Sequence, residues 1–77
     1  MTIQEFNKMY EKHIELIRES GTSEVFKDAD LSGLTLKGVN FSGAEFGSAK
    51  FDNSEMEYCV FRNCSFEGAS FESTKLL

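Results

Sequence analysis

The chain has no proline and no tryptophan, only one histidine and two cysteines, and no long run of hydrophobic residues. A membrane-spanning helix needs about 18 or more consecutive apolar residues, so we expect no such helix and no membrane partner. Because there is a single histidine, a Ser/His/Asp or Cys/His catalytic arrangement could use only His13. The aromatic residues are eight phenylalanines and two tyrosines, which favours a core packed with one type of ring.

The N-terminus also lacks the basic start, the apolar centre and the small-residue cleavage site of a secretory signal peptide. We therefore expect a cytoplasmic location, where both cysteines stay reduced. A chain of 77 residues with a formal net charge of −5 predicts one small acidic domain. At this size a hydrophobic core alone gives marginal stability, so the covering of open ends matters.

Apolar residues recur at every fifth position over the last two thirds of the chain. A helix repeats its apolar residues at about 3.6 positions and a simple strand at about 2, so a period of five indicates a repeat architecture. A second series, of small or aliphatic residues with a few polar ones, lies two positions ahead of the first. The central series is Leu31, Leu36, Phe41, Phe46, Phe51, Met56, Phe61, Phe66, Phe71 and Leu76, and the small series is Ala29, Leu34, Val39, Ala44, Ala49, Ser54, Cys59, Cys64, Ala69 and Thr74.

Segments such as Ala-Asp-Leu-Ser-Gly, Val-Asn-Phe-Ser-Gly and Cys-Ser-Phe-Glu-Gly resemble the repeats of the pentapeptide-repeat proteins, and the resemblance covers residues 28–77. It implies a mainly β fold, a short right-handed quadrilateral β-helix of about two and a half coils, with one repeat on each side of the square. Residues twenty apart would then stack. The expected inner columns are Leu31/Phe51/Phe71, Leu36/Met56/Leu76, Phe41/Phe61 and Phe46/Phe66.

The small series would stack in the same way, beside the large residues. Its polar members, Ser54 and Thr74, then need hydrogen-bond partners inside the fold. The glycines at positions 33, 38, 43, 47 and 68 are expected at corners, where the backbone turns. They are not followed by the Gly-Lys-Ser/Thr of a phosphate-binding loop.

A capping box, Thr2-Ile3-Gln4-Glu5, predicts a helix from about residue 2 to residue 20, with Gly21 as its C-cap. We expect residues 1–27 to form a capping helix and connector, and residues 28–77 to form the β-helix in the same compact unit. The alternative is that the apolar stripe of the helix docks a partner. This stripe consists of Ile3, Phe6, Tyr10, His13, Ile14 and Ile17, with Met9 and Leu16 beside it.

The residues that could carry chemistry are few. His13 lies on the apolar stripe, so we expect a partly buried, hydrogen-bonded histidine and not a catalytic base. Cys59 and Cys64 belong to the inward small series, and no further cysteine or histidine lies near enough to complete a four-ligand metal site. We therefore expect no catalytic residue, no metal, no cofactor and no enzymatic activity.

The charge is uneven along the chain. Residues 1–27 carry five acidic and four basic side chains, whereas residues 28–77 carry eight acidic and four basic ones. On the implied β-helix, two adjacent sides carry five acidic residues together with Lys50, and Asp28 lies at the first corner. Glu55 and Glu57 belong to another side, which Lys37 and Lys75 balance. Carboxylates twenty residues apart would be spaced by about 4.8 Å, in a regular anionic column. The expected partner-binding edge consists of Asp28, Asp30, Glu45, Asp52, Glu67 and Glu72.

Such an edge could compete with DNA for the lysine and arginine side chains that bind phosphates. The chain also resembles, through its size and charge, small phage inhibitors of the anti-CRISPR type. The leading hypothesis is a DNA mimic that inhibits a bacterial nucleic-acid-binding complex, with a CRISPR effector complex as its first target, in a bacterial or phage-infected cell. Direct binding of nucleic acid is disfavoured by the sign of the charge.

Two alternatives remain open. Some pentapeptide-repeat proteins bind and protect DNA gyrase, but they have a longer shaft, so this chain would approach their length only as a dimer joined through its C-terminal end. The other alternative is a structural or assembly module that binds through its helix or its open C-terminal end, where Leu76 and Leu77 would form the interface. The sequence allows a monomer or a C-terminal homodimer.

Overall fold

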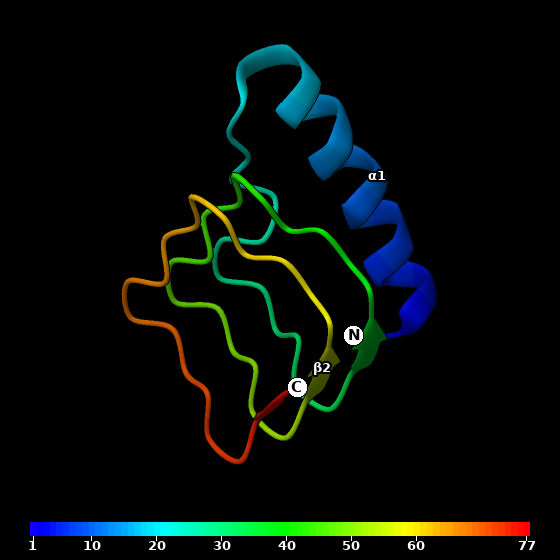
Figure 1. The fold of residues 1–77 in the computed structure, drawn as a ribbon, viewed down its shortest axis with the longest axis vertical. Helices are drawn as coiled ribbons and strands as arrows, with labels where there is room; N and C mark the ends of the chain where they lie inside the picture. Colours follow the sequence, from blue (N-terminus) through cyan, green and yellow to red (C-terminus); the bar gives the residue numbers. More distant parts are fainter.

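The computed structural model describes all 77 residues. One helix, α1 (Ile3–Ser20), is followed by a chain that winds into stacked coils, and α1 lies beside the coil nearest to it in the sequence (Figure 1). Three short strands pair in the parallel order β1-β2-β3: β1 (Thr35–Lys37), β2 (Glu55–Glu57) and β3 (Lys75–Leu76). No helix is both long and apolar enough to cross a membrane.

The coils repeat every twenty residues. Leu36 pairs with Met56, and Met56 with Leu76, in parallel register. Isolated parallel bridges carry the same spacing to other parts of the coil, for example from Asp30 to Lys50 and from Lys50 to Ser70. Because each repeat has five residues, four repeats make one coil. This confirms the predicted stacking of residues twenty apart, in a β-helix-like arrangement.

The predicted phenylalanine columns are present. Phe41 stacks on Phe61 with 5.3 Å between ring centroids and 11° between ring planes. Phe46 stacks on Phe66 at 5.2 Å and 4°, and Phe51 on Phe71 at 4.7 Å and 2°. Rings of neighbouring columns meet edge to face, as Phe46 and Phe51 do, so each ring contacts others both along and across the shaft.

The two polar members of the small series find the expected partners. The Ser54 hydroxyl, which is fully buried, donates a hydrogen bond of 2.6 Å to the carbonyl oxygen of Phe51. The hydroxyl of Thr74, one coil further on, donates to the same carbonyl, also over 2.6 Å. Both hydroxyl groups are therefore satisfied inside the fold.

The backbone turns at the second residue after each central residue, where φ is positive in every repeat. Glycine occupies four of these positions, 33, 38, 43 and 68. The prediction was wrong for Gly47, because it directly follows a central residue and Ser48 makes the turn. The non-glycine residues that adopt this left-handed conformation are Asp28, Ser48, Asn53, Tyr58, Asn63 and Ser73.

The helix begins and ends as predicted. The Thr2 side chain accepts from the Glu5 amide while the Glu5 side chain accepts from the Thr2 amide, and Gly21 closes the C-terminus in a left-handed conformation. Hydrogen bonding of the Glu5 carboxylate to Thr2, above all to its backbone amide, lowers the pKa of Glu5. The helix starts at Ile3, since Thr2 is its N-cap.

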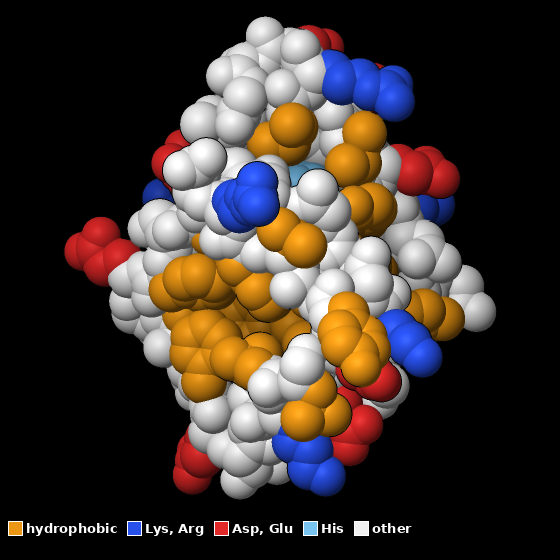
Figure 2. Space-filling model, viewed as in Figure 1, with side chains coloured by type: hydrophobic (Ala, Val, Ile, Leu, Met, Phe, Trp, Pro, Cys, Tyr) orange, Lys and Arg blue, Asp and Glu red, His pale blue; other side chains and the backbone are white.

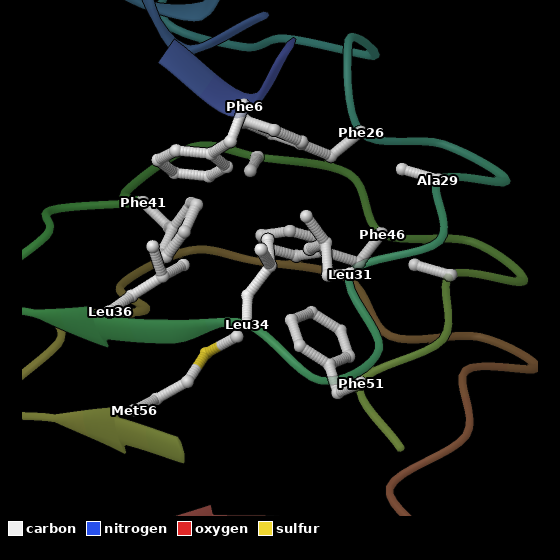
Figure 3. Close-up of a cluster of buried hydrophobic side chains, with 12 residues drawn as sticks. Phe6, Phe26, Ala29, Leu31, Leu34, Leu36, Phe41, Phe46, Phe51 and Met56 are labelled. Carbon is white, nitrogen blue, oxygen red and sulfur yellow. The ribbon is translucent and has the colours of Figure 1, made fainter. Parts of the chain in front are cut away.

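The apolar side of α1 packs against the first coil and not against a free surface. Phe6 projects from the helix toward Phe26 and Phe41, stacking on the first and meeting the second edge to face (Figure 3). The Tyr10 hydroxyl donates a hydrogen bond of 2.8 Å to the carbonyl oxygen of Asn40. The helix therefore acts as an intramolecular cover, which a solenoid needs at its end.

Phe26 extends the central series by one repeat toward the N-terminus. It lies five residues before Leu31, is fully buried and stacks on Phe46 with 5.6 Å between ring centroids. The expected boundary after residue 27 leaves Phe26 in the connector, whereas in the structure it belongs to the aromatic core. The chain also enters the coils with a shifted pairing, from Ser23 to Ala44, which is twenty-one residues.

His13 differs from its expectation. Its side chain is completely buried, with 0% exposed, and neither ring nitrogen has a hydrogen-bond partner. The prediction of a partly buried, satisfied histidine was therefore wrong. The apolar rings of Tyr10 and Phe26 pack around the imidazole and offer it no hydrogen-bond acceptor.

Candidate functional site

The acidic residues predicted for one edge fall into separate groups. Glu45 and Glu67 line a polar hollow of about 280 Å³ on the surface of the coils. Gly47 and Ser65 form part of its wall, and no hydrophobic residue lines it. A Cβ on Gly47 would lie 3.8 Å from the carbonyl oxygen of Glu67 and 3.9 Å from Cγ of Lys27, in ordinary contact with both. The carboxylates of two successive coils thus face the same depression.

A third glutamate joins this group. Glu24, in the connector after α1, lines the hollow together with Lys27. Glu24 does not belong to the predicted acidic edge, since its position depends on how the connector enters the first coil. The shifted pairing of Ser23 with Ala44 places Glu24 next to Glu45 in the sheet direction. We name Glu24, Glu45 and Glu67 the glutamate cluster; with Lys27 it has a formal charge of −2.

Asp52 and Glu72 form the second group, one coil apart. The Asp52 carboxylate accepts hydrogen bonds from the hydroxyl of Ser70 and, over 2.9 Å, from the backbone amide of Glu72. Asp52 is half-buried and Glu72 is exposed. The two residues lie one coil apart, and the Asp52 carboxylate also holds these two coils together.

Asp30 and Asp28 contribute differently. Asp30 pairs with Lys50 in the next coil, so a basic side chain lies beside it. Hydrogen bonds from the hydroxyl and the backbone amide of Ser32 lower the pKa of Asp30, and Lys50 lowers it a little further. Asp28 is exposed at a turn, with φ of 60°, and its amide donates to the carbonyl oxygen of Gly47 over 2.8 Å.

The two thiols are free and half-buried. Cys64 donates a hydrogen bond of 3.1 Å to the carbonyl oxygen of Phe41, and burial raises the pKa of its thiol. Cys59 lies 3.8 Å from the carbonyl oxygen of Leu36. No group of three or more histidine, cysteine, aspartate or glutamate side chains is arranged to hold a metal ion.

The last coil presents apolar side chains to solvent. Leu76 and Leu77 are 59% and 71% exposed. Hydrophobic side chains gather around a hollow on the face of the molecule shown in Figure 2. The exposed large hydrophobic residues in the C-terminal part of the coils are Tyr58, Val60, Phe71, Leu76 and Leu77.

Comparison with known proteins identifies the class of protein. The family described as pentapeptide repeats, in nine copies, matches residues 25–75. The match begins one residue before Phe26, in agreement with the extra repeat that the structure reveals. The chain belongs to the pentapeptide-repeat family. No curated protein and no solved structure shows a significant match to it.

Proposed function

We propose that this pentapeptide-repeat protein is a non-enzymatic inhibitor that binds, as a DNA mimic, to a basic nucleic-acid channel of a bacterial machine in the cytoplasm. The glutamate cluster carries the proposal, because it brings three carboxylates from different turns of the chain around one open, polar hollow. A lysine or arginine side chain that binds a phosphate also binds a carboxylate, and arginine does so with two parallel hydrogen bonds.

The geometry favours a small basic target site. The molecule measures 34 × 25 × 20 Å along its principal axes. About two and a half coils at about 4.8 Å each give about 12 Å of shaft, the length of three or four base pairs. This suits blocking a few phosphate-binding side chains better than filling a long groove. A CRISPR effector complex is therefore the first target in our proposal, and DNA gyrase is the second.

Paired charge-neutralising variants test the proposal. Glu45→Gln with Glu67→Gln removes two charges from the glutamate cluster and keeps the side-chain shape. Glu11→Gln with Glu19→Gln removes the same charge from exposed positions of α1 and serves as the control. Each protein is added to a purified CRISPR effector complex or to DNA gyrase that holds fluorescent DNA, and DNA release is followed by anisotropy at 50 and 300 mM salt.

We expect the original chain to release DNA from one of the two complexes, less efficiently at high salt because exposed charge pairs are screened. The cluster variant should need about tenfold more protein, which is about 1.4 kcal/mol of binding energy, whereas the control should stay within about twofold. If both variants lost the same ability to release DNA, the overall charge of the chain, and not the glutamate cluster, would account for the effect. No release from either complex would reject both targets.

A second candidate function, an assembly module, is favoured by the exposed leucines of the last coil. Leu76→Ser with Leu77→Ser would then abolish self-association or partner binding, while the glutamate variants would leave it unchanged. Sedimentation velocity of the chain and of the serine variant distinguishes a monomer from a C-terminal homodimer.

The coils themselves are proposed to be right-handed and four-sided, as the resemblance to the family implies. A crystal structure of the chain would test this geometry directly.

A further inference from the structure

His13 is the polar side chain that the fold buries without a partner. It lies between α1 and the first coil, is 0% exposed, and neither Nδ1 nor Nε2 has a hydrogen-bond partner. Buried polar groups are nearly always hydrogen-bonded, and each exception calls for an explanation. His13 is also the only histidine of the chain.

Rings from both elements enclose the imidazole. Tyr10 of α1 lies 5.7 Å from it, and Phe26 of the first coil lies 5.6 Å from it, measured between ring centroids. Phe26 in turn packs on Phe6 and Phe46, so the contact is continuous with the aromatic core. His13 thus occupies the seam along which α1 covers the coils.

No charged group around the seam stabilises the protonated form of the imidazole. Tyr10 is the ionisable side chain whose ring packs on His13, and its hydroxyl is directed to the carbonyl oxygen of Asn40. Phe26, on the coil side, has no charge. Burial alone lowers the pKa of His13, without a contribution from any charged side chain of α1, the connector or the coils. No charged group and no hydrogen-bond acceptor at the seam would therefore stabilise an imidazolium ion.

We infer that His13 is an acid-sensitive latch: the neutral imidazole keeps α1 on the first coil, and its protonation shifts α1 toward a detached state while the coils stay stacked. An imidazolium has two N–H donors and a full charge, both of which require water in this apolar seam. Detachment of α1 supplies that water and exposes the rings of Phe26 and Phe41.

The coils can stay stacked because their own hydrogen bonds do not involve α1. The Leu31 amide donates to Lys50, the Phe41 amide to Val60 and the Phe51 amide to Ser70, each over 2.7–2.8 Å. Between the end of α1 and the coils the links are the Ser23 amide to Gly43 and the Glu45 amide to Ser23. Local opening of one covering element is a common low-energy excursion of a folded protein.

The direction of the pH dependence follows from proton binding. With α1 detached, His13 has its ordinary pKa of 6.5, whereas in the docked state its pKa is lower. The detached state therefore binds more protons below pH 6.5, and docking weakens as the pH falls from 6.5 toward the lowered pKa. Histidine is the side chain whose ordinary pKa places its change of charge between about pH 5 and 8, and His13 is the only histidine of the chain.

The test combines a titration with native-state amide exchange. The Cε1 proton shift of His13 in the unmodified chain, followed by NMR from pH 8 to pH 4.5, gives its pKa in the folded protein. Amide exchange of α1 and of the coils is then measured at pH 7.0 and pH 5.5 and corrected for the intrinsic pH dependence of exchange. His13→Leu and His13→Met serve as variants that cannot be protonated.

We expect a midpoint below 6.5, and a loss of α1 protection between pH 7.0 and 5.5 of several-fold, up to about eightfold, the limit for one group of ordinary pKa 6.5. Coil amides such as those of Phe41 and Phe51 should keep their protection, and α1 of the variants should lose none. A midpoint at or above 6.5, equal α1 protection at both pH values, or the same loss in a variant would overturn the latch.

Discussion

The carboxylate of Asp52 accepts a hydrogen bond of 2.9 Å from the backbone amide of Glu72, its neighbour one coil further on. The same oxygen accepts from the Ser70 hydroxyl, so Asp52 ties the second and third coils together. We predict that Asp52→Asn lowers the free energy of unfolding by about 1–2 kcal/mol, because both hydrogen bonds lose their charged acceptor. Thermal unfolding should show a Tm lower by about 4–8 °C per kcal/mol.

Glu72→Gln is the matched control for this prediction. It removes a charge from the same column, but the Glu72 side chain is exposed and no hydrogen bond to its carboxylate is present. Its Tm should change by less than about 2 °C. Equal Tm values for the two variants would contradict the structural role of Asp52. The difference also matters for the mimicry proposal, since Asp52 variants would confound binding with stability.

Much of the fold follows from the sequence because the five-residue period fixes which residues meet. Once four repeats make a coil, the stacks of Phe46 on Phe66 and of Phe51 on Phe71 follow, and the structure has both. The capping box of Thr2 and Glu5 is similarly local, involving residues three apart. Local and periodic features need no knowledge of the rest of the molecule.

The features that the sequence did not reveal depend on how the helix and the connector meet the coils. Whether His13 finds a hydrogen-bond partner depends on which side chain of the first coil packs against it at the seam. That side chain is Phe26, whose ring forms no hydrogen bond. The position of Glu24 depends on the shifted entry from Ser23 to Ala44, which breaks the spacing of twenty. No period extends across such a junction, so the glutamate cluster could be predicted only in its Glu45 and Glu67 members.

Gly43 provides a second prediction, through its contact with the end of α1. It has φ of 82°, and an added Cβ would lie 2.6 Å from the carbonyl oxygen of Gly21 and 2.7 Å from Cδ1 of Ile17. Gly43→Ala therefore combines left-handed strain with a clash against backbone, and we expect a loss of about 3 kcal/mol or more. Urea unfolding followed by circular dichroism measures this loss.

Gly33 offers the comparison for this substitution. It has a similar φ of 74°, but a Cβ there would meet nothing within 4 Å. Gly33→Ala should cost about 1–2 kcal/mol, the strain alone. If the two alanine variants were equally stable, the close approach of α1 to Gly43 would be refuted.

The Cys64 thiol provides a pH-dependent prediction. Burial raises its pKa above the ordinary value of 9.0, and the thiolate is the reactive form. Alkylation of Cys64 by iodoacetamide, measured by mass spectrometry in a Cys59→Ala background, should therefore still increase with pH above 9.0. In the urea-unfolded chain the alkylation rate should level off once the pH exceeds the ordinary pKa of 9.0. A plateau below pH 9 in the folded protein would contradict the burial of this thiol.

Tyr58 is the residue whose side chain fits its backbone position least well. Its φ is 56°, a left-handed conformation that disfavours a bulky side chain, and the side chain gains little from burial because it is 71% exposed. Asparagine tolerates this conformation and already occupies the equivalent positions 53 and 63. We predict that Tyr58→Asn raises the free energy of unfolding by about 0.5–1 kcal/mol.

The reverse change at an equivalent turn, Asn63→Tyr, should lower the free energy of unfolding by a similar amount. Urea titration of both variants checks the pair. A loss of stability in Tyr58→Asn would mean that the exposed ring makes a favourable contact that outweighs the strain of its backbone.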